Sequence, residues 1–267
     1  MTHSHDKTVF TRQEECCCCG EDTEDKKQNC MICGRPLHYF QRERMFECSI
    51  CHQLKPGNAV CENGHFVCDE CHSNKSQDAL QVLTNSTEKD PVILLQKIFQ
   101  LPSVHMHGPE HHSIVPAVLI TAYHNCGGEI DFESSLAEAW KRGQKIAGGA
   151  CGYLGVCGAA AGAGIFASIV SGATPLSEKE WEIPQRLTAE CLEAMIAIGG
   201  PRCCKRTSRI AIACAAEFSA KYFHVEMPVS RTACGYFQMN RECIRERCPF
   251  YPKKKNGLPN NLGESSN

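Results

Sequence analysis

Four pairs of potential metal ligands follow one another between residues 30 and 71, and this pattern limits the possible folds more than any other feature. The pairs are Cys30 and Cys33, Cys48 and Cys51, Cys61 and His65, and Cys68 and Cys71. Two cysteines separated by two residues can bind the same tetrahedral ion, so eight ligands of this kind predict two zinc sites. A segment this short cannot bury a sufficient apolar core. We therefore expect two zinc ions to hold together a structural module over residues 28–73.

The order of the pairs allows two arrangements of the ligands. In a sequential arrangement neighbouring pairs share an ion, whereas in an interleaved, cross-brace arrangement the first pair joins the third and the second joins the fourth. The pattern Cys-x3-His-x2-Cys-x2-Cys from Cys61 resembles the centre of RING-type zinc modules, which favours the cross-brace. The resemblance is confined to ligand spacing and implies no ubiquitin ligase activity. A protein partner could dock on this module, and we interpret His38, His52 and His72 as surface residues.

The rest of the chain divides by composition. Residues 1–27 are polar and are expected to be disordered, with a run of four cysteines, Cys16–Cys19, that could form an adventitious metal or redox site. Residues 74–90 are expected to be a linker, in which residues 79–83 could form a helical turn. Residues 91–252 are expected to be an α-helical, Cys-rich domain and residues 253–267 a disordered tail.

Apolar residues recur with helical spacing in the C-terminal part, over residues 92–99, 114–123, 136–145 and 159–170. Ser177, followed three residues later by Glu180, predicts a capping box at the start of a helix that runs to Ile198 and ends at Gly199. The predicted fold is therefore a mainly α C-terminal domain with a small zinc-ribbon or cross-brace N-terminal module.

Charge and hydropathy exclude several classes of partner. The formal net charge is −2 and the isoelectric point about 6.6, so no general attraction to nucleic acid is expected. The longest apolar run, residues 165–170, is far shorter than the roughly 20 residues that span a bilayer, so no membrane helix is expected. The first ten residues are polar and do not resemble a signal sequence, which predicts a cytoplasmic protein. In a reducing compartment its 21 cysteines are more often metal ligands or reactive thiols than disulfides.

Several cysteines of the C-terminal domain are candidate metal ligands because they lie in or beside Gly-rich helical sequence. They are Cys151, Cys203, Cys204, Cys214, Cys234, Cys243 and Cys248. Thiolates in a dry helical pocket favour an iron–sulfur cluster such as [4Fe–4S], or zinc. The last three could join the same cluster, hold a second one, or bind a zinc ion that closes the C-terminus. Cys126 and Cys191 occupy apolar helical positions and are interpreted as core thiols.

The segment Val104–Ser113 contains four histidines and one glutamate ahead of an apolar helix. Histidine can act as a general acid or base near neutral pH or as a metal ligand, and a helix N-terminus favours an anionic group. The alternative is a polar loop that caps the helix. The candidate acid–base residues are Glu110, His111, His112 and Lys205, and the candidate residues for binding a small anionic substrate are Arg202 and His107.

Five motifs together resemble an uncharacterised family of anaerobic archaea and bacteria, DUF5714. They are Cys-x-x-Gly-His-Phe-Val-Cys-Asp-Glu-Cys-His from Cys61, Met-His-Gly-Pro-Glu-His-His from Met106, Gly-Gly-Ala-Cys-Gly from Gly148, Gly-Gly-Pro-Arg-Cys-Cys-Lys-Arg from Gly199, and Glu-Cys-Ile-Arg-Glu-Arg-Cys-Pro from Glu242. Membership of this family implies no activity.

Residues 149–222 are also similar to the catalytic domain of iron–sulfur L-serine dehydratases, in the order of a Gly-Cys segment, a Gly-x-Thr-Pro helix start and two further cysteines. This resemblance implies a cluster held by Cys151, Cys203 and Cys214, with one iron open to act as a Lewis acid. Lys205 stands where that family has an acidic residue. The leading hypothesis is an oxygen-sensitive lyase that acts on a small anionic substrate. The alternative is a zinc-rich binding or thiol redox-sensing protein without enzymatic activity.

Overall fold

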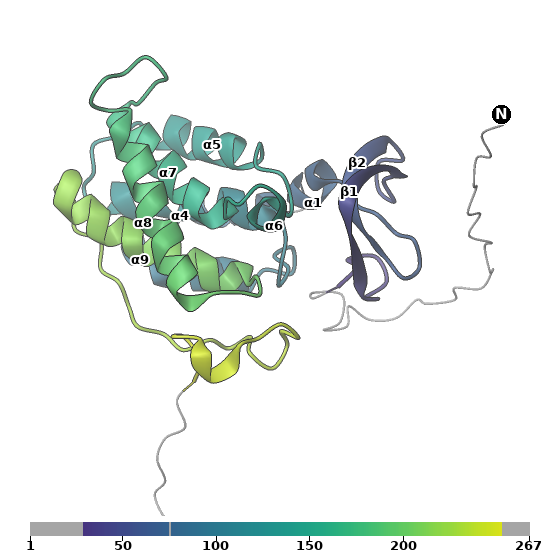
Figure 1. The fold of residues 1–267 in the computed structure, drawn as a ribbon. Coiled ribbons are helices and arrows are strands. Elements are labelled where there is room, and N and C mark those ends of the chain that lie inside the picture. The colour runs from purple at the N-terminus through teal and green to yellow at the C-terminus, as the bar shows by residue number, and fades with distance from the viewer. Residues whose placement is uncertain (1–28, 75, 253–267) are drawn as a thin grey trace, which may run out of the picture.

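The computed structural model describes residues 29–74 and 76–252. The expectations for residues 1–27, including Cys16–Cys19, and for residues 253–267 lie outside the described residues. Figure 1 shows two strands and a short helix beside a group of longer helices, with the C-terminal segment passing below the helices.

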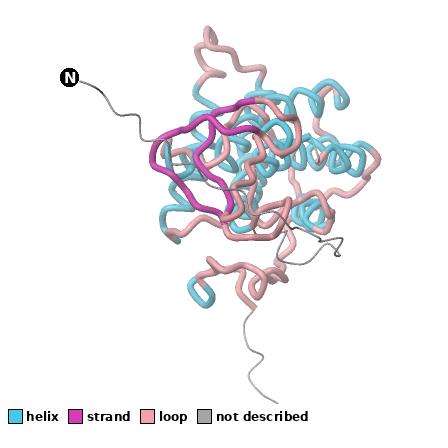
Figure 2. The backbone as a smooth tube through the Cα atoms, turned by 90° about the vertical axis from the view of Figure 1, so that its right-hand side faces the viewer, coloured by secondary structure: helices cyan, strands magenta, loops and turns pink. Residues whose placement is uncertain are grey.

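The N-terminal module is built on an antiparallel hairpin of β1 (Leu37–Glu47) and β2 (Leu54–Cys61), followed by α1 (Asp69–Asn74). Figure 2 views the molecule from this side, and both strands lie within this module. Its buried cluster consists of Cys48, Phe66 and Cys68, with Phe46 and Val60 partly buried against it. A cluster with one fully buried large apolar side chain does little to offset the conformational entropy of the module, and metal ligation by its cysteines would supply the missing stabilisation.

The rest of the described chain is mainly α, as predicted. Its helices are α2 (Gln77–Thr84), α3 (Pro91–Phe99), α4 (Glu110–Asn125), α5 (Phe132–Gly143), α6 (Ala150–Tyr153), α7 (Gly158–Ser171), α8 (Glu182–Ile198) and α9 (Cys204–Tyr222), with a 3-10 turn, η2 (Arg245–Arg247). Helix α4 is the centre of this domain, because every residue from Glu110 to Tyr123 is buried. Helices α3, α5, α7 and α9 pack against it. A helix that is buried all round cannot have a polar surface face, so its N-terminal Glu and His residues must lie inside the protein.

Two boundaries differ from the sequence predictions. The expected linker contains α2, whose Ala79 and Leu83 are fully buried in the helical core. Helix α8 begins at Glu182 rather than after Ser177. The reason is local: the hydroxyl of Ser177 accepts a hydrogen bond from the backbone N–H of Thr174 at 3.0 Å, which closes a separate turn. The predicted end of this helix is confirmed, because Gly199 adopts a φ of 81° there.

The segment after α9 is held against the helices by polar contacts. Asp90 caps α3 by accepting a hydrogen bond from Val92 N at 2.8 Å, and its other oxygen accepts one from Ser230 N at 2.7 Å. The hydroxyl of Tyr236 donates to Phe99 O at 3.0 Å. These contacts bring the last cysteines of the chain to the N-terminal end of α9. No helix in the described part of the chain is both long and apolar enough to cross a membrane.

Candidate metal centres

The eight N-terminal ligands form two groups that can each hold a metal ion. One group is Cys30, Cys33, Cys61 and His65, and the other is Cys48, Cys51, Cys68 and Cys71. The first pair of ligands joins the third and the second joins the fourth, so the arrangement is the interleaved cross-brace.

The sulfur positions in both groups suit a single tetrahedral ion. Cys33 Sγ lies 3.8 Å from Cys61 Sγ, and Cys51 Sγ lies 3.9 Å from Cys68 Sγ. Two sulfurs bound to one zinc ion at ~2.3 Å are separated by about 3.8 Å, so the donors fit such an ion without rearrangement. The sulfur of Cys61 also accepts the backbone N–H of His65 at 3.2 Å, a contact that stabilises a thiolate.

A second concentration of cysteines lines one pocket in the C-terminal domain. Cys203 lies at the N-cap of α9, and Cys234, Cys243 and Cys248 belong to the segment that follows this helix. Among the described residues, no three of these sulfurs lie within 4.8 Å of one another, in contrast to the N-terminal groups. The four thiols are therefore not arranged around a single ion as the N-terminal ligands are.

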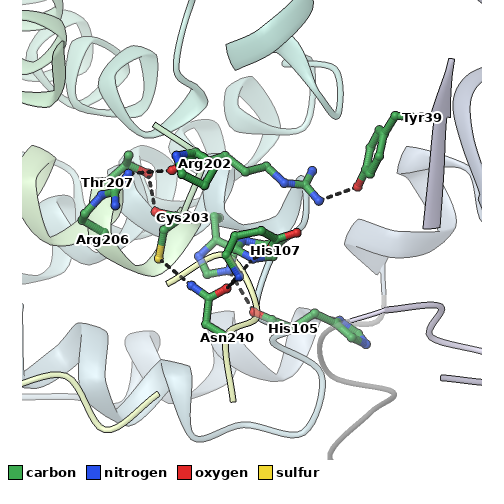
Figure 3. A network of polar contacts seen from close by, with 11 residues as sticks. Tyr39, His105, His107, Arg202, Cys203, Arg206, Thr207 and Asn240 are labelled. Carbon is green, nitrogen blue, oxygen red and sulfur yellow. Dashed lines mark hydrogen bonds and ion pairs between the residues drawn. The ribbon is translucent and has the colours of Figure 1, made fainter. Parts of the chain in front are cut away.

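Backbone N–H groups point at each of these four sulfurs. Tyr236 N lies 3.3 Å from Cys234 Sγ, and Arg245 N lies 3.4 Å from Cys243 Sγ. Burial raises the pKa of the Cys203 and Cys248 thiols, while the backbone N–H groups of Arg206 and Phe250 act in the opposite direction. Asn240 donates a further hydrogen bond to Cys203 Sγ at 3.5 Å (Figure 3). Such N–H to sulfur contacts favour thiolates and tune the clusters that thiolates hold.

Three buried cations line the same pocket: Lys205, Arg206 and Arg209. None of them forms an ion pair with a carboxylate among the residues that the structure describes. Lys205 Nζ and Arg209 Nε lack any hydrogen-bond partner there. Buried charges require a counter-charge, so the pocket is suited to an anionic occupant.

The remaining candidate cysteines lie elsewhere. Cys214 is ten residues beyond the start of α9, about 15 Å along the helix, and its neighbour is the buried thiol of Cys191. Cys151 is exposed, and the sulfur of Cys204 faces the backbone N–H of Gly108. The grouping of Cys151, Cys203 and Cys214 around one cluster is therefore wrong, because the helix separates Cys203 from Cys214 by more than a cluster can bridge.

The structure brings the predicted histidine and glutamate residues together with the Gly-Gly-Pro-Arg-Cys-Cys-Lys turn. Burial lowers the pKa of His111 to about 3 and that of Lys205 to about 8. His112 Nδ1 donates to Ile146 O at 3.0 Å, so His112 has a structural contact. His107 Nε2 lies 2.8 Å from Glu242 and 3.3 Å from Asn240.

Arg202 reaches away from the four-Cys pocket. It lies over the ring of Tyr39 and donates to the hydroxyl of that residue (Figure 3). This contact ties the helical domain to the N-terminal module, where Asp69 also accepts the backbone N–H of Gly148 at 2.6 Å.

Two further residues at this junction were missed as site residues. His72 and His105 lie beside Glu110, and His72 is mostly buried rather than at the surface. Burial alone would raise the pKa of the Glu110 carboxyl, yet these two histidines hold it well below its usual range. Sequence spacing could not have joined His72 to a glutamate 38 positions later.

The fold and the sites define a cysteine-rich protein with a helical domain and two N-terminal groups of ligands that could hold metal ions. Residues 79–251 match the family of unknown function DUF5714, and the chain belongs to this family. No curated protein and no solved structure matches the chain, so the similarity to serine dehydratases has no support from these comparisons.

Proposed function

We propose that this protein is a redox-active iron–sulfur protein, in which a [4Fe–4S] cluster is held by Cys203, Cys234, Cys243 and Cys248. Zinc in the two N-terminal groups builds the module that packs beside the helical domain. The observation that carries the proposal is the combination of four converging thiols with three buried cations that have no carboxylate partner in the described chain.

A [4Fe–4S] cluster with four thiolate ligands carries a net negative charge and is larger than a single ion. Both properties match the pocket, since its sulfurs are too far apart for one zinc ion and its walls are cationic. The backbone N–H groups directed at the sulfurs stabilise the anionic ligands. A zinc ion would require the sulfurs to approach to about 3.8 Å, which the N-terminal groups already achieve without rearrangement.

The number of ligands also bears on the chemistry. Four thiolates occupy every iron of a [4Fe–4S] cluster, whereas a Lewis-acid role requires one iron open to substrate. The geometry therefore supports electron transfer or redox sensing rather than dehydration. The half-buried position of all four thiols lets an electron donor or acceptor approach the cluster.

The proposal is tested by purifying the full chain without oxygen and measuring iron, acid-labile sulfide, zinc and the visible spectrum. We expect about four irons and four sulfides per chain, about two or more zinc ions, and a broad visible absorbance that dithionite bleaches. Cys243→Ser should lose iron, sulfide and colour together.

The matched control is Cys126→Ser, since this half-buried thiol at the end of α4 contacts Lys89 O and lies outside the pocket. This variant should keep the cluster. A colourless protein that gains no iron and sulfide on anaerobic reconstitution, but binds additional zinc through Cys243, would overturn the proposal and favour a zinc-rich binding protein. Reversible formation of a disulfide between these thiols in metal-free protein would favour a thiol switch instead.

A further inference from the structure

A third group of ligands lies at the junction of the two parts of the molecule. It consists of His72 from α1, His105 from the loop before α4, and Glu110, the first residue of α4. One ligand atom from each lies within 4.8 Å of the others. The three residues come from both the zinc module and the helical domain, and Glu110 is completely buried.

The polar atoms of this group face one another. His72 Nδ1 lies 3.0 Å from Glu110 Oε2 and His105 Nδ1 lies 3.7 Å from Glu110 Oε1, as ion pairs if the histidines are protonated. Beyond these contacts, His72 Nδ1, His105 Nδ1 and Glu110 Oε2 have no hydrogen bond among the described residues. Buried polar atoms without a hydrogen bond are rare and costly, and here three of them lie together.

The surrounding contacts fix the orientation of the ligands. Glu110 Oε1 accepts the backbone N–H of His105 at 3.0 Å, which leaves Oε2 for another interaction. His111 Nε2 donates to His105 O at 3.0 Å and so holds the loop that carries His105. Outer hydrogen bonds of this kind commonly orient the residues that bind a metal.

Gly108 keeps the space between the ligands open. A Cβ atom at this position would lie 2.0 Å from Glu110 Oε2 and 2.6 Å from His72 Cε1. The backbone of the His105–Glu110 loop therefore passes so close to the group that any side chain would fill it.

From this arrangement we infer that His72, His105 and Glu110 form a mononuclear site for a divalent transition metal such as Zn²⁺. Two imidazoles and one carboxylate are a known ligand set for zinc and for non-haem iron. Three protein ligands leave at least one coordination position for water or a small anionic ligand, the pattern of a catalytic rather than a structural site. Because His72 belongs to the zinc module, the metal also joins this module to the helical domain.

The inference does not depend on the nature of the C-terminal centre. Zinc content is measured for the full chain after saturation with Zn²⁺ and removal of weakly bound ions. Wild-type protein should hold one zinc more per chain than His105→Ala, Glu110→Gln and Gly108→Ala. This difference of one zinc ion per chain is expected whether the four-Cys pocket contains iron or an additional zinc ion. The test therefore remains valid if the iron–sulfur proposal fails.

Two control variants should retain the third ion. His124→Ala removes an exposed histidine from the last turn of α4, where its ring stacks on Phe132. Gly152→Ala adds a methyl group where nothing lies within 4 Å. Retention of the N-terminal zinc and of the helical circular dichroism signal would show that each variant is folded.

Co²⁺ added to protein that keeps the N-terminal zinc but has lost the third ion to a mild chelator identifies the donor atoms. It should give weak visible bands without the intense near-ultraviolet absorbance of cobalt thiolates, and Gly108→Ala should abolish these bands. Equal metal content in wild-type, His105→Ala and Gly108→Ala protein would overturn the inference, as would a thiolate spectrum at this position.

Discussion

Replacement of Lys205 by Met should raise the free energy of unfolding of the protein when the four-Cys pocket is empty. When the pocket is occupied, the same substitution should give no increase or a decrease. Lys205 is 2% exposed and has no hydrogen-bond partner for its amine in the described chain. Burial lowers its pKa from 10.5 to about 8, and this difference corresponds to about 3 kcal/mol of preference for the neutral amine. At pH 7 the empty pocket therefore carries a charge that destabilises the folded state.

The aromatic rings beside the amine offset part of this cost. Lys205 Nζ lies 4.2 Å from the ring centre of Phe99 and 4.5 Å from that of Tyr236. A desolvated cation–π interaction contributes up to about 2 kcal/mol, and methionine keeps the apolar contact with both rings. Lys205→Met should therefore raise the free energy of unfolding of cluster-free protein by about 1–3 kcal/mol.

With an anionic cluster in the pocket, the same substitution removes a counter-charge. The increase in the free energy of unfolding should then disappear or become a decrease, and the variant should release iron faster than the wild type. Urea unfolding followed by tryptophan fluorescence measures both states, because Trp140 is buried in the helical domain. The control is Lys221→Met in the last turn of the same helix, which is exposed and should change stability by less than ~0.5 kcal/mol in either state. An equal increase in the free energy of unfolding of the cluster-free and the cluster-loaded protein would refute the argument that the pocket holds an anion.

Three further substitutions or treatments probe the fold. Zinc chelation should abolish the β1–β2 hairpin but leave most of the helical circular dichroism signal, because Phe66 is the main apolar residue buried between the strands and α1. Phe166→Ala should lower the free energy of unfolding by about 3–5 kcal/mol in urea titrations, since this fully buried ring packs against Tyr123 and Phe223. Asp90→Ala should cost about 1–3 kcal/mol and increase proteolysis after α9, because one carboxylate caps α3 and binds Ser230 N; unchanged proteolysis would contradict this role.

The helical domain shows which helices the local sequence pattern could predict and which it could not. Apolar spacing located α3, α5 and α7 because burial of one helix face requires a period that the sequence itself contains. Helix α4 is buried all round, and the concentration of apolar residues over 114–123 located it. The start of α8 was wrong because Thr174 and Ser177 bond to each other rather than to the helix, and a capping pattern does not distinguish the two. The sequence allowed a helical turn at residues 79–83 but did not indicate that α2 joins the core, because two buried residues, Ala79 and Leu83, are too few to mark a core helix in a polar segment.

The sequence by itself identified the eight N-terminal ligands and favoured their cross-brace pairing, because two ligands at short separation can reach one ion in almost any fold. The structure decided which pairs share an ion. Only the tertiary structure decided which C-terminal thiols converge. It placed Cys203 with Cys234, Cys243 and Cys248 and separated it from Cys214. Hydrogen bonds that Ser230 N and the Tyr236 hydroxyl donate to Asp90 and to Phe99 O hold the C-terminal segment at the start of α9. The contact between His72 and Glu110 likewise depends on the packing of the N-terminal module against the helical domain. The spacing of residues within either part does not indicate that contact.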